Sequence, residues 1–245
     1  MNIIIPMAGE GSRFRKAGFE KPKPFIDVAG KPMIKWVIEN LLVPGASFTL
    51  IARQEHLEAE KELVASLEQE FPLRFISVNQ LTEGTACTVL FARQFINNDT
   101  PLLIANSDQW VEFSLADMLA DAQARKLEGS ILTFTDHERN PKWSFAKADE
   151  QGYVTEVKEK VVISDKATVG IYYFAKGSDF VNAALDMIVH NDRVNNEFYT
   201  CPVYNWMIRE DKKIGIFDVE FEDMHGLGTP EDLNLFLSFL GNKKK

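Results

Sequence analysis

Residues 2–14 read NIIIPMAGEGSRF, a short apolar run followed by a glycine-rich turn. The three isoleucines favour a buried β-strand over residues 2–6, because β-branched side chains pack well on a pleated surface. Gly9 and Gly11 allow a sharp turn and let backbone N–H groups approach a ligand closely. Ligands of open α/β sheets bind at the carboxyl ends of parallel strands. This turn is therefore a candidate anion site.

The rest of the chain alternates apolar runs with amphipathic segments, which is typical of a sheet covered by helices on both faces. We expect strands at residues 2–6, 48–52, 74–78, 101–106, 130–134, 145–148, 154–158, 168–174 and 214–219. We expect helices at residues 32–42, 57–70, 85–94, 114–126, 178–190, 201–210 and from Thr229 onward. This pattern predicts one α/β domain over residues 1–245, with three layers and a mixed, mainly parallel central sheet.

Composition narrows the range of partners. The net charge of −9 argues against nucleic acid or an anionic membrane, because both attract basic surfaces. Residues 1–35 nevertheless carry seven basic and three acidic side chains, which indicates a local anion site. The apolar start of about five residues is too short for a signal segment or a membrane span, so we expect a cytoplasmic protein. Cys87 and Cys201 indicate neither a disulfide framework nor a zinc site.

The glycine turn fits neither of two familiar phosphate-binding loops. A dinucleotide fingerprint needs Gly or Ala where Phe14 stands, and a Walker loop needs a Gly-Lys-Ser/Thr sequence that is absent. Arg13 can add a bidentate contact to a phosphate, and the prolines of the segment KPKP at residues 21–24 hold Lys23 on a stiff backbone. A tight turn without a ligand and a loop with ordinary surface lysines remain the alternatives.

Three motifs occur in order: GEGSRF at residues 9–14, KPKP at 21–24 and GKPMI at 30–34. Together they resemble the signature of the sugar-phosphate nucleotidyltransferase superfamily, and the likeness extends over nearly the whole chain. The resemblance implies a Rossmann-like nucleotidyltransferase fold. It also implies a reaction that joins a nucleoside triphosphate to a phosphorylated small molecule and releases pyrophosphate.

The resemblance assigns the nucleotide site. It implies that the glycine loop and its Arg bind the triphosphate, that Lys23 contacts the α-phosphate, and that the segment QLTEGTA at residues 80–86 contacts the base. The nucleotide-binding residues are then Met7, Ala8, Gly9, Gly11, Ser12, Arg13, Lys23, Gln80, Gly84 and Thr85. The catalytic residues are Arg13, Lys23 and Asp108. Gly84 and Thr85 also read as an ordinary helix start.

Asp108 follows the apolar run at residues 102–106, so a buried strand would deliver its carboxylate to the ligand edge of the sheet. The resemblance implies that it holds Mg²⁺, whereas a turn-capping role is the alternative. The resemblance also places Glu159, Lys160 and Gly170 against the acceptor. Without it, Glu159 and Lys160 would read as a surface ion pair of little energetic weight.

One position departs from the family pattern. The family sequence Asp-x-Gly-Thr-Pro-Glu supplies the second metal ligand, but here the segment reads GLGTPE, with Gly226 in place of the acidic residue. We consider Asp223 as a substitute, or a metal held by Asp108 and phosphates alone. The following residues form a helix start, with Thr229 as N-cap and Asp232 at the third helical position.

Several functional readings follow. The loop resembles the form found among cytidylyltransferases and some uridylyltransferases, which slightly favours CTP. The resemblance implies that the acceptor is a sugar 1-phosphate or a non-sugar phosphate such as phosphocholine or a phosphorylated amino acid. A surface-glycan precursor pathway, such as that of a capsule, is the expected setting, and a homo-oligomer is compatible with the resemblance. The alternatives are a nucleotide-binding regulatory module without catalysis, which Gly226 supports, and a glycosyltransferase, which would not need the triphosphate loop.

Overall fold

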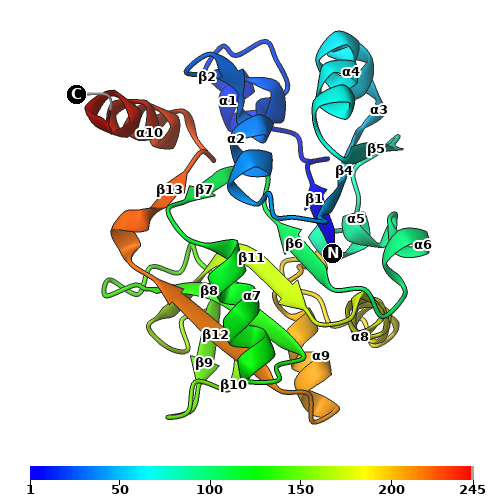
Figure 1. Ribbon diagram of the computed structural model, residues 1–245, viewed down its shortest axis with the longest axis vertical. Coiled ribbons are helices and arrows are strands. Elements are labelled where there is room, and N and C mark those ends of the chain that lie inside the picture. The colour runs from blue at the N-terminus through cyan, green and yellow to red at the C-terminus, as the bar shows by residue number, and fades with distance from the viewer. Residues whose placement is uncertain (244–245) are drawn as a thin grey trace.

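The computed structural model describes residues 1–243 and places strand β1 (Asn2–Pro6) in the middle of a nine-stranded mixed sheet (Figure 1). β1 runs parallel to β4 (Ser47–Arg53) on one side and to β6 (Leu102–Ala105) on the other. β5 (Leu73–Val78) continues the parallel part beyond β4. Ile3, Ile4 and Ile5 are fully buried, which is why this apolar run forms a central strand.

The second half of the chain extends the same sheet. β11 (Lys166–Phe174) lies antiparallel to β6 and to β8 (Gly129–Thr135), and so joins the two halves. β12 (Ile214–Val219) runs parallel to β8, while β9 (Phe145–Ala148) and β10 (Val154–Lys158) form an antiparallel pair at the end of the strand order. The pairing of β11 with β8 shifts register between Thr168 and Tyr172, where Gly170 has a φ of +95°.

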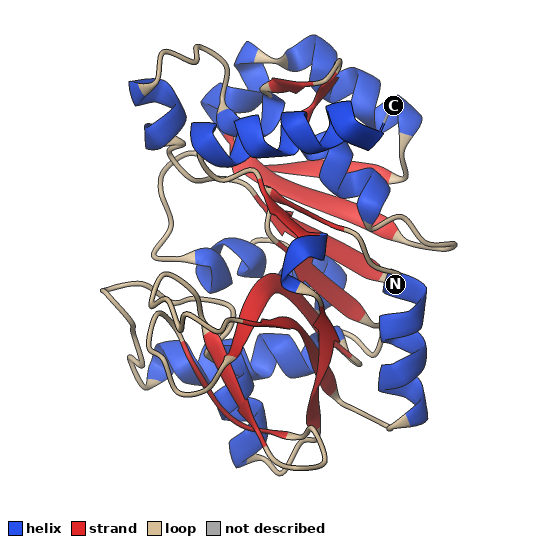
Figure 2. Cartoon of the chain, turned by 90° about the vertical axis from the view of Figure 1, so that its left-hand side faces the viewer, coloured by secondary structure: helices blue, strands red, loops and turns tan. Residues whose placement is uncertain are grey.

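Helices cover both faces of the sheet, as Figure 2 shows. Alternate side chains of β1 enter different cores, with Ile4 in one and Ile3 and Ile5 in the other. The first core includes side chains of α5 (Thr85–Leu90), α6 (Arg93–Ile96), α8 (Gly177–Val189) and α9 (Val203–Arg209). The second includes side chains of α2 (Met33–Asn40), α3 (Gln54–Ala59), α4 (Lys61–Glu70) and α7 (Leu115–Ala124).

The C-terminal segment returns to the N-terminal half. After the short 3-10 turn Phe221–Asp223, β13 (Met224–Gly226) pairs with β7 (Gln109–Val111). Helix α10 (Pro230–Lys243) then lies beside α1 (Ser12–Lys16) and α2 (Figure 1). A third core forms there, in which Phe14 of α1 and Met33 of α2 share a cluster with Leu233 and Phe236 of α10.

The predicted fold class is confirmed. The prediction of one domain at residues 1–245 stays a prediction, supported by the sheet that runs through both halves. The helix expected at 57–70 is divided at Glu60, where φ is −118°, and the helix expected at 85–94 is divided into α5 and α6. The sequence did not predict α1, β7 or β13, which are too short for a periodic pattern. No helix within residues 1–243 combines the length and apolar composition needed to cross a membrane.

Candidate active site

The glycine loop connects β1 to α1 at the carboxyl edge of the parallel strands. Gly11 has a φ of +62°, and a Cβ there would lie only 3.2 Å from Lys23 Cβ, so glycine lets the loop and the Lys23 segment approach closely. The backbone N–H groups of Gly9 and Gly11 have no hydrogen-bond partner among residues 1–243. They are therefore available to an anion. Phe14, which follows the loop and is fully buried in the third core, anchors the loop at its C-terminal end.

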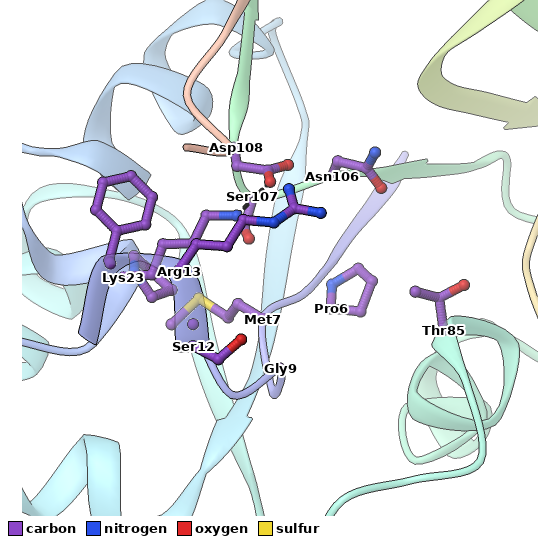
Figure 3. Close-up of a pocket in the computed structure, with 14 residues that line it drawn as sticks. Pro6, Met7, Gly9, Ser12, Arg13, Lys23, Thr85, Asn106, Ser107 and Asp108 are labelled. Carbon is purple, nitrogen blue, oxygen red and sulfur yellow. Dashed lines mark hydrogen bonds and ion pairs between the residues drawn. The ribbon is translucent and has the colours of Figure 1, made fainter. Parts of the chain in front are cut away.

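A cavity of about 420 Å³ opens above this loop, and we call it the glycine-loop pocket (Figure 3). It is lined by Pro6, Met7, Gly9, Gly11, Ser12, Arg13, Phe14, Lys23, Pro24, Thr85, Asn106, Ser107, Asp108 and Gly228. All three residues expected to be catalytic line it: Arg13, Lys23 and Asp108. In Figure 3 these three side chains gather on one side of the pocket, with Thr85 on the opposite side. The pocket thus combines free backbone donors, two cationic side chains and one carboxylate.

Lys23 and Asp108 form an ion pair between Nζ and Oδ2. Their side chains are 19% and 25% exposed, so solvent screens this pair less than the surface pairs of the chain. Lys23 begins the 3-10 turn Lys23–Phe25, and the buried Pro24 and Phe25 hold its backbone in place. Lys21 lies outside the pocket, where it pairs with Glu60 at 3.3 Å.

The fold family implies a divalent cation, and the surroundings of Asp108 fit one. The Lys23 ammonium forms an ion pair with Asp108 Oδ2, so a positive charge already lies at this oxygen. A Cβ on Gly228 would lie 3.2 Å from the same oxygen, which means that glycine keeps the space beside it open. Carboxylate oxygen is the donor that Mg²⁺ prefers. Residues 1–243 contain no cluster of three or more His, Cys, Asp or Glu side chains suited to a metal, so phosphates and waters would complete the shell.

The structure does not bring Asp223 to this position. In the β7–β13 ladder the Leu227 N–H donates to Asp108 O, whereas Asp223 O accepts from the Glu112 N–H four residues farther along both strands. Four residues of strand span about 13 Å. The backbone of Asp223 therefore lies at the far end of a ladder that begins at Asp108, which speaks against Asp223 as the substitute ligand, and that assignment stays a prediction.

A second cavity, of about 280 Å³, adjoins the first and shares Thr85 and Asn106 with it. We call it the acceptor-side pocket. It is lined by Thr85, Asn106, Gln109, Lys142, Trp143, Ser144, Glu159, Lys160, Thr168, Val169, Gly170, Tyr172, Tyr199, Thr200 and Cys201. The three residues expected to bind the acceptor, Glu159, Lys160 and Gly170, all line this pocket. The two pockets therefore meet at Thr85 and Asn106.

Glu159 and Lys160 differ in their electrostatics. Burial raises the pKa of Glu159, and the hydrogen bond from Ser144 Oγ and the charge of Lys160 only partly oppose this effect. For Lys160, burial acts to lower the pKa, but the hydrogen bond to Tyr199 Oη at 3.1 Å and nearby acidic charges raise it overall. Lys160 is therefore a fixed cation at neutral pH, as the binding of a phosphate would require.

Two expected base-binding residues lie elsewhere. Gln80 is exposed and lines a separate hollow formed by residues 78–83, Cys87 and Phe91, so a base contact from Gln80 stays a prediction. Gly84 has a φ of +112°, and a Cβ there would stand 2.6 Å from Phe198 N. Packing alone thus requires glycine at position 84.

Sequence reasoning missed Asn106, which lines both pockets, and Lys142, which adds a second lysine to the acceptor-side pocket. Asn106 could have been found from its place between the apolar run of β6 and Asp108. The sequence carries no comparable signal for Lys142, because the loop between β8 and β9 has no recognisable motif.

The fold agrees with comparisons to known proteins. The profile of the nucleotidyl transferase family matches residues 2–204, and the chain belongs to that family. Among curated relatives, a mannose-1-phosphate guanylyltransferase catalytic subunit beta from Dictyostelium discoideum is 28% identical over 177 residues, which cover 71% of this chain and 49% of the relative. A mannose-1-phosphate guanyltransferase from Schizosaccharomyces pombe is 29% identical over 239 residues, covering 95% and 62%. The chain spans about half the length of several curated relatives that it matches.

Among solved structures, a nucleoside-diphosphate-sugar pyrophosphorylase from Vibrio cholerae has the same fold, with a TM-score of 0.82 and 24% identity over 96% of this chain and 99% of that one. A putative glucose-1-phosphate thymidylyltransferase from Bacillus anthracis reaches a TM-score of 0.75 at 18% identity, covering 98% of this chain and 94% of that one. The resemblance drawn from the loop motifs is thus confirmed at the level of family and fold.

Proposed function

We propose that this chain is a nucleotidyltransferase that couples a nucleoside triphosphate to a sugar 1-phosphate and releases pyrophosphate. The observation that carries the proposal is the pair of adjoining pockets. One offers free glycine-loop N–H groups, Arg13 and Lys23 to a triphosphate, and the other offers Lys160 to a second phosphate. A site for a single nucleotide would not need the second cationic pocket.

The relatives guide the choice of substrates. The curated relatives are mannose-1-phosphate guanylyltransferases, which supports a sugar 1-phosphate as the acceptor. They lend no support to the expected preference for CTP. We therefore propose GTP and mannose 1-phosphate as the first pair to test, with CTP and non-sugar phosphates as competitors. Synthesis of a surface-glycan precursor in the cytoplasm remains part of the proposal.

The reaction follows from the placement of charge. An oxygen of the acceptor phosphate attacks the α-phosphorus in line, a new P–O bond forms, and the bond to pyrophosphate breaks on the opposite side. The acceptor phosphate is mostly ionised at neutral pH, so no side chain has to remove a proton. Lys23 and Arg13 would orient the triphosphate and offset the charge that develops at the α-phosphate. Magnesium bound at Asp108 would neutralise further phosphate charge.

The test is a pyrophosphate-release assay in which GTP, CTP, UTP, ATP and dTTP are each combined with a panel of sugar 1-phosphates, phosphocholine and phosphorylated amino acids. Lys160→Ala should raise KM for the acceptor more than KM for the nucleotide, whereas Lys21→Ala, outside both pockets, should change neither. Nucleotide binding without pyrophosphate release for any pair would favour the non-catalytic regulatory module instead.

A further inference from the structure

We propose that Asp232 supplies the second carboxylate for the cation at Asp108 and so replaces the acidic side chain that position 226 lacks. This inference rests on the proposed function, because the cation is the one that the nucleotidyl transfer reaction would use. Asp232 lies in the first turn of α10, outside the residues matched by the family profile.

The two carboxylates border the same space beside Gly228. A Cβ at Gly228 would lie 3.2 Å from Asp108 Oδ2 and 3.8 Å from Asp232 Oδ2. Glycine at position 228 therefore leaves open the volume that lies between the two acidic side chains. A hard cation bound in that volume could use both oxygens, directly or through one of the waters that Mg²⁺ retains.

Asp232 also adjoins the space that a side chain at position 226 would enter. A Cβ at Gly226 would lie 3.5 Å from Asp232 Cγ and 3.6 Å from its Oδ2. Gly226 belongs to strand β13 and does not have a left-handed φ, so its backbone does not require glycine. A carboxylate from the following helix thus lies next to the position from which the family's acidic side chain would extend.

The Asp232 carboxylate is not engaged by its own helix. Its backbone N–H donates to Thr229 Oγ1 at 3.1 Å, which caps α10. Among residues 1–243, however, no side chain or backbone N–H donates to the Asp232 carboxylate, which is partly exposed. Glu231 sits in the same first turn but is exposed, and it is not among the nearest neighbours of a Cβ at Gly226 or Gly228, whereas Asp232 is near both. Any effect of helix-terminal charge alone should therefore be common to Glu231 and Asp232.

The experiment measures Mn²⁺ binding to the full chain without nucleotide, by the loss of the free-ion signal in electron paramagnetic resonance. Mn²⁺ serves as the probe because it shares the carboxylate and water preference of Mg²⁺. Asp232→Asn should weaken binding at least about tenfold, the lower end of the loss seen when even an outer-shell partner is removed. Glu231→Gln, the matched control, should bind Mn²⁺ as wild type does. Thermal unfolding of each variant reports whether it is folded.

The double variant Gly226→Asp with Asp232→Asn returns a carboxylate to the family position and should recover most of the binding. Unchanged Mn²⁺ affinity in Asp232→Asn, an equal loss in Glu231→Gln, or no saturable binding by wild type would each overturn the inference. Failure of the proposed function looks different: wild type would then release no pyrophosphate with any substrate pair, whatever its Mn²⁺ affinity.

Discussion

Replacing Gly170 by alanine tests whether the bulge in β11 packs too closely against Asn106 to admit a side chain. Gly170 O accepts a hydrogen bond from Asn106 N at 3.0 Å, and a Cβ at position 170 would overlap the Asn106 side-chain amide and stand 3.0 Å from Gln109 Oε1. Because Asn106 lines both pockets, the added methyl group should disturb the nucleotide and the acceptor together.

Two terms set the size of the effect. An L-residue at a φ of +95° costs about 1–2 kcal/mol, and forcing one methyl group into a packed site typically costs about 1–3 kcal/mol. We therefore expect Gly170→Ala to lower the free energy of unfolding by about 2–5 kcal/mol. Gly9→Ala is the control, because Gly9 does not have a left-handed φ and a Cβ at position 9 would have no neighbouring atom within 4 Å. Its free energy of unfolding should change by less than about 0.5 kcal/mol.

Urea denaturation followed by circular dichroism measures both variants. Adding Asn106→Ala to Gly170→Ala should remove the steric overlap and so restore that part of the free energy of unfolding. The backbone strain at position 170 should remain, so a double-mutant cycle separates the two terms. Wild-type stability of Gly170→Ala would refute the argument. A double variant no more stable than the sum of its single changes would show that Asn106 is not the obstacle.

Three further predictions concern the site directly. Lys23→Ala should lower turnover at saturating substrates by about 100-fold, since one preorganised charge at a reacting phosphate contributes roughly 3 kcal/mol; a loss no larger than that of Lys21→Ala would place the α-phosphate elsewhere. Gln80→Ala should reduce the preference for one nucleotide over the others, as the family resemblance implies; an unchanged ratio would instead fit its exposed place outside the glycine-loop pocket. Burial raises the pKa of Glu159 above 4.5, so the folded chain holds this proton more tightly than the unfolded chain, and stability is lost as the pH rises from 4.5 through the folded pKa. Glu159→Gln should therefore raise Tm more at pH 7 than at pH 4; equal shifts of Tm at both pH values would contradict this.

Much of the fold was predictable because the pattern is local. Each long strand has an apolar run, and the buried stretches Ile3–Ile5 and Leu102–Ala105 coincide with the runs in the sequence. Pairings between distant short segments were not predictable. β7 and β13 have three residues each and lie more than a hundred positions apart, so neither periodicity nor turn signals could reveal their ladder.

The site residues likewise differ in whether the local sequence could predict them. Lys23 and Asp108 follow recognisable motifs, and the structure brings them into contact. Asp232 appeared in the sequence only as a residue of a well-formed helix start. Its position near Asp108 depends on the return of β13 along β7, which local sequence cannot show. The absence of an acidic residue at position 226 was therefore visible in the sequence, whereas the proximity of Asp232 to that position was not.

The third core joins the first and last parts of the chain, and this has a consequence for biosynthesis. Leu233 and Phe236, with which Phe14 shares that core, are added to the growing chain more than 200 residues after Phe14. At translation rates of about 5–20 residues per second, the interval is on the order of ten seconds or more. During that time α1 has Met33 and other early partners but lacks the part of its packing that α10 supplies. The nascent chain should therefore bring the glycine loop to its final order only after α10 has been made, although the loop itself is translated first.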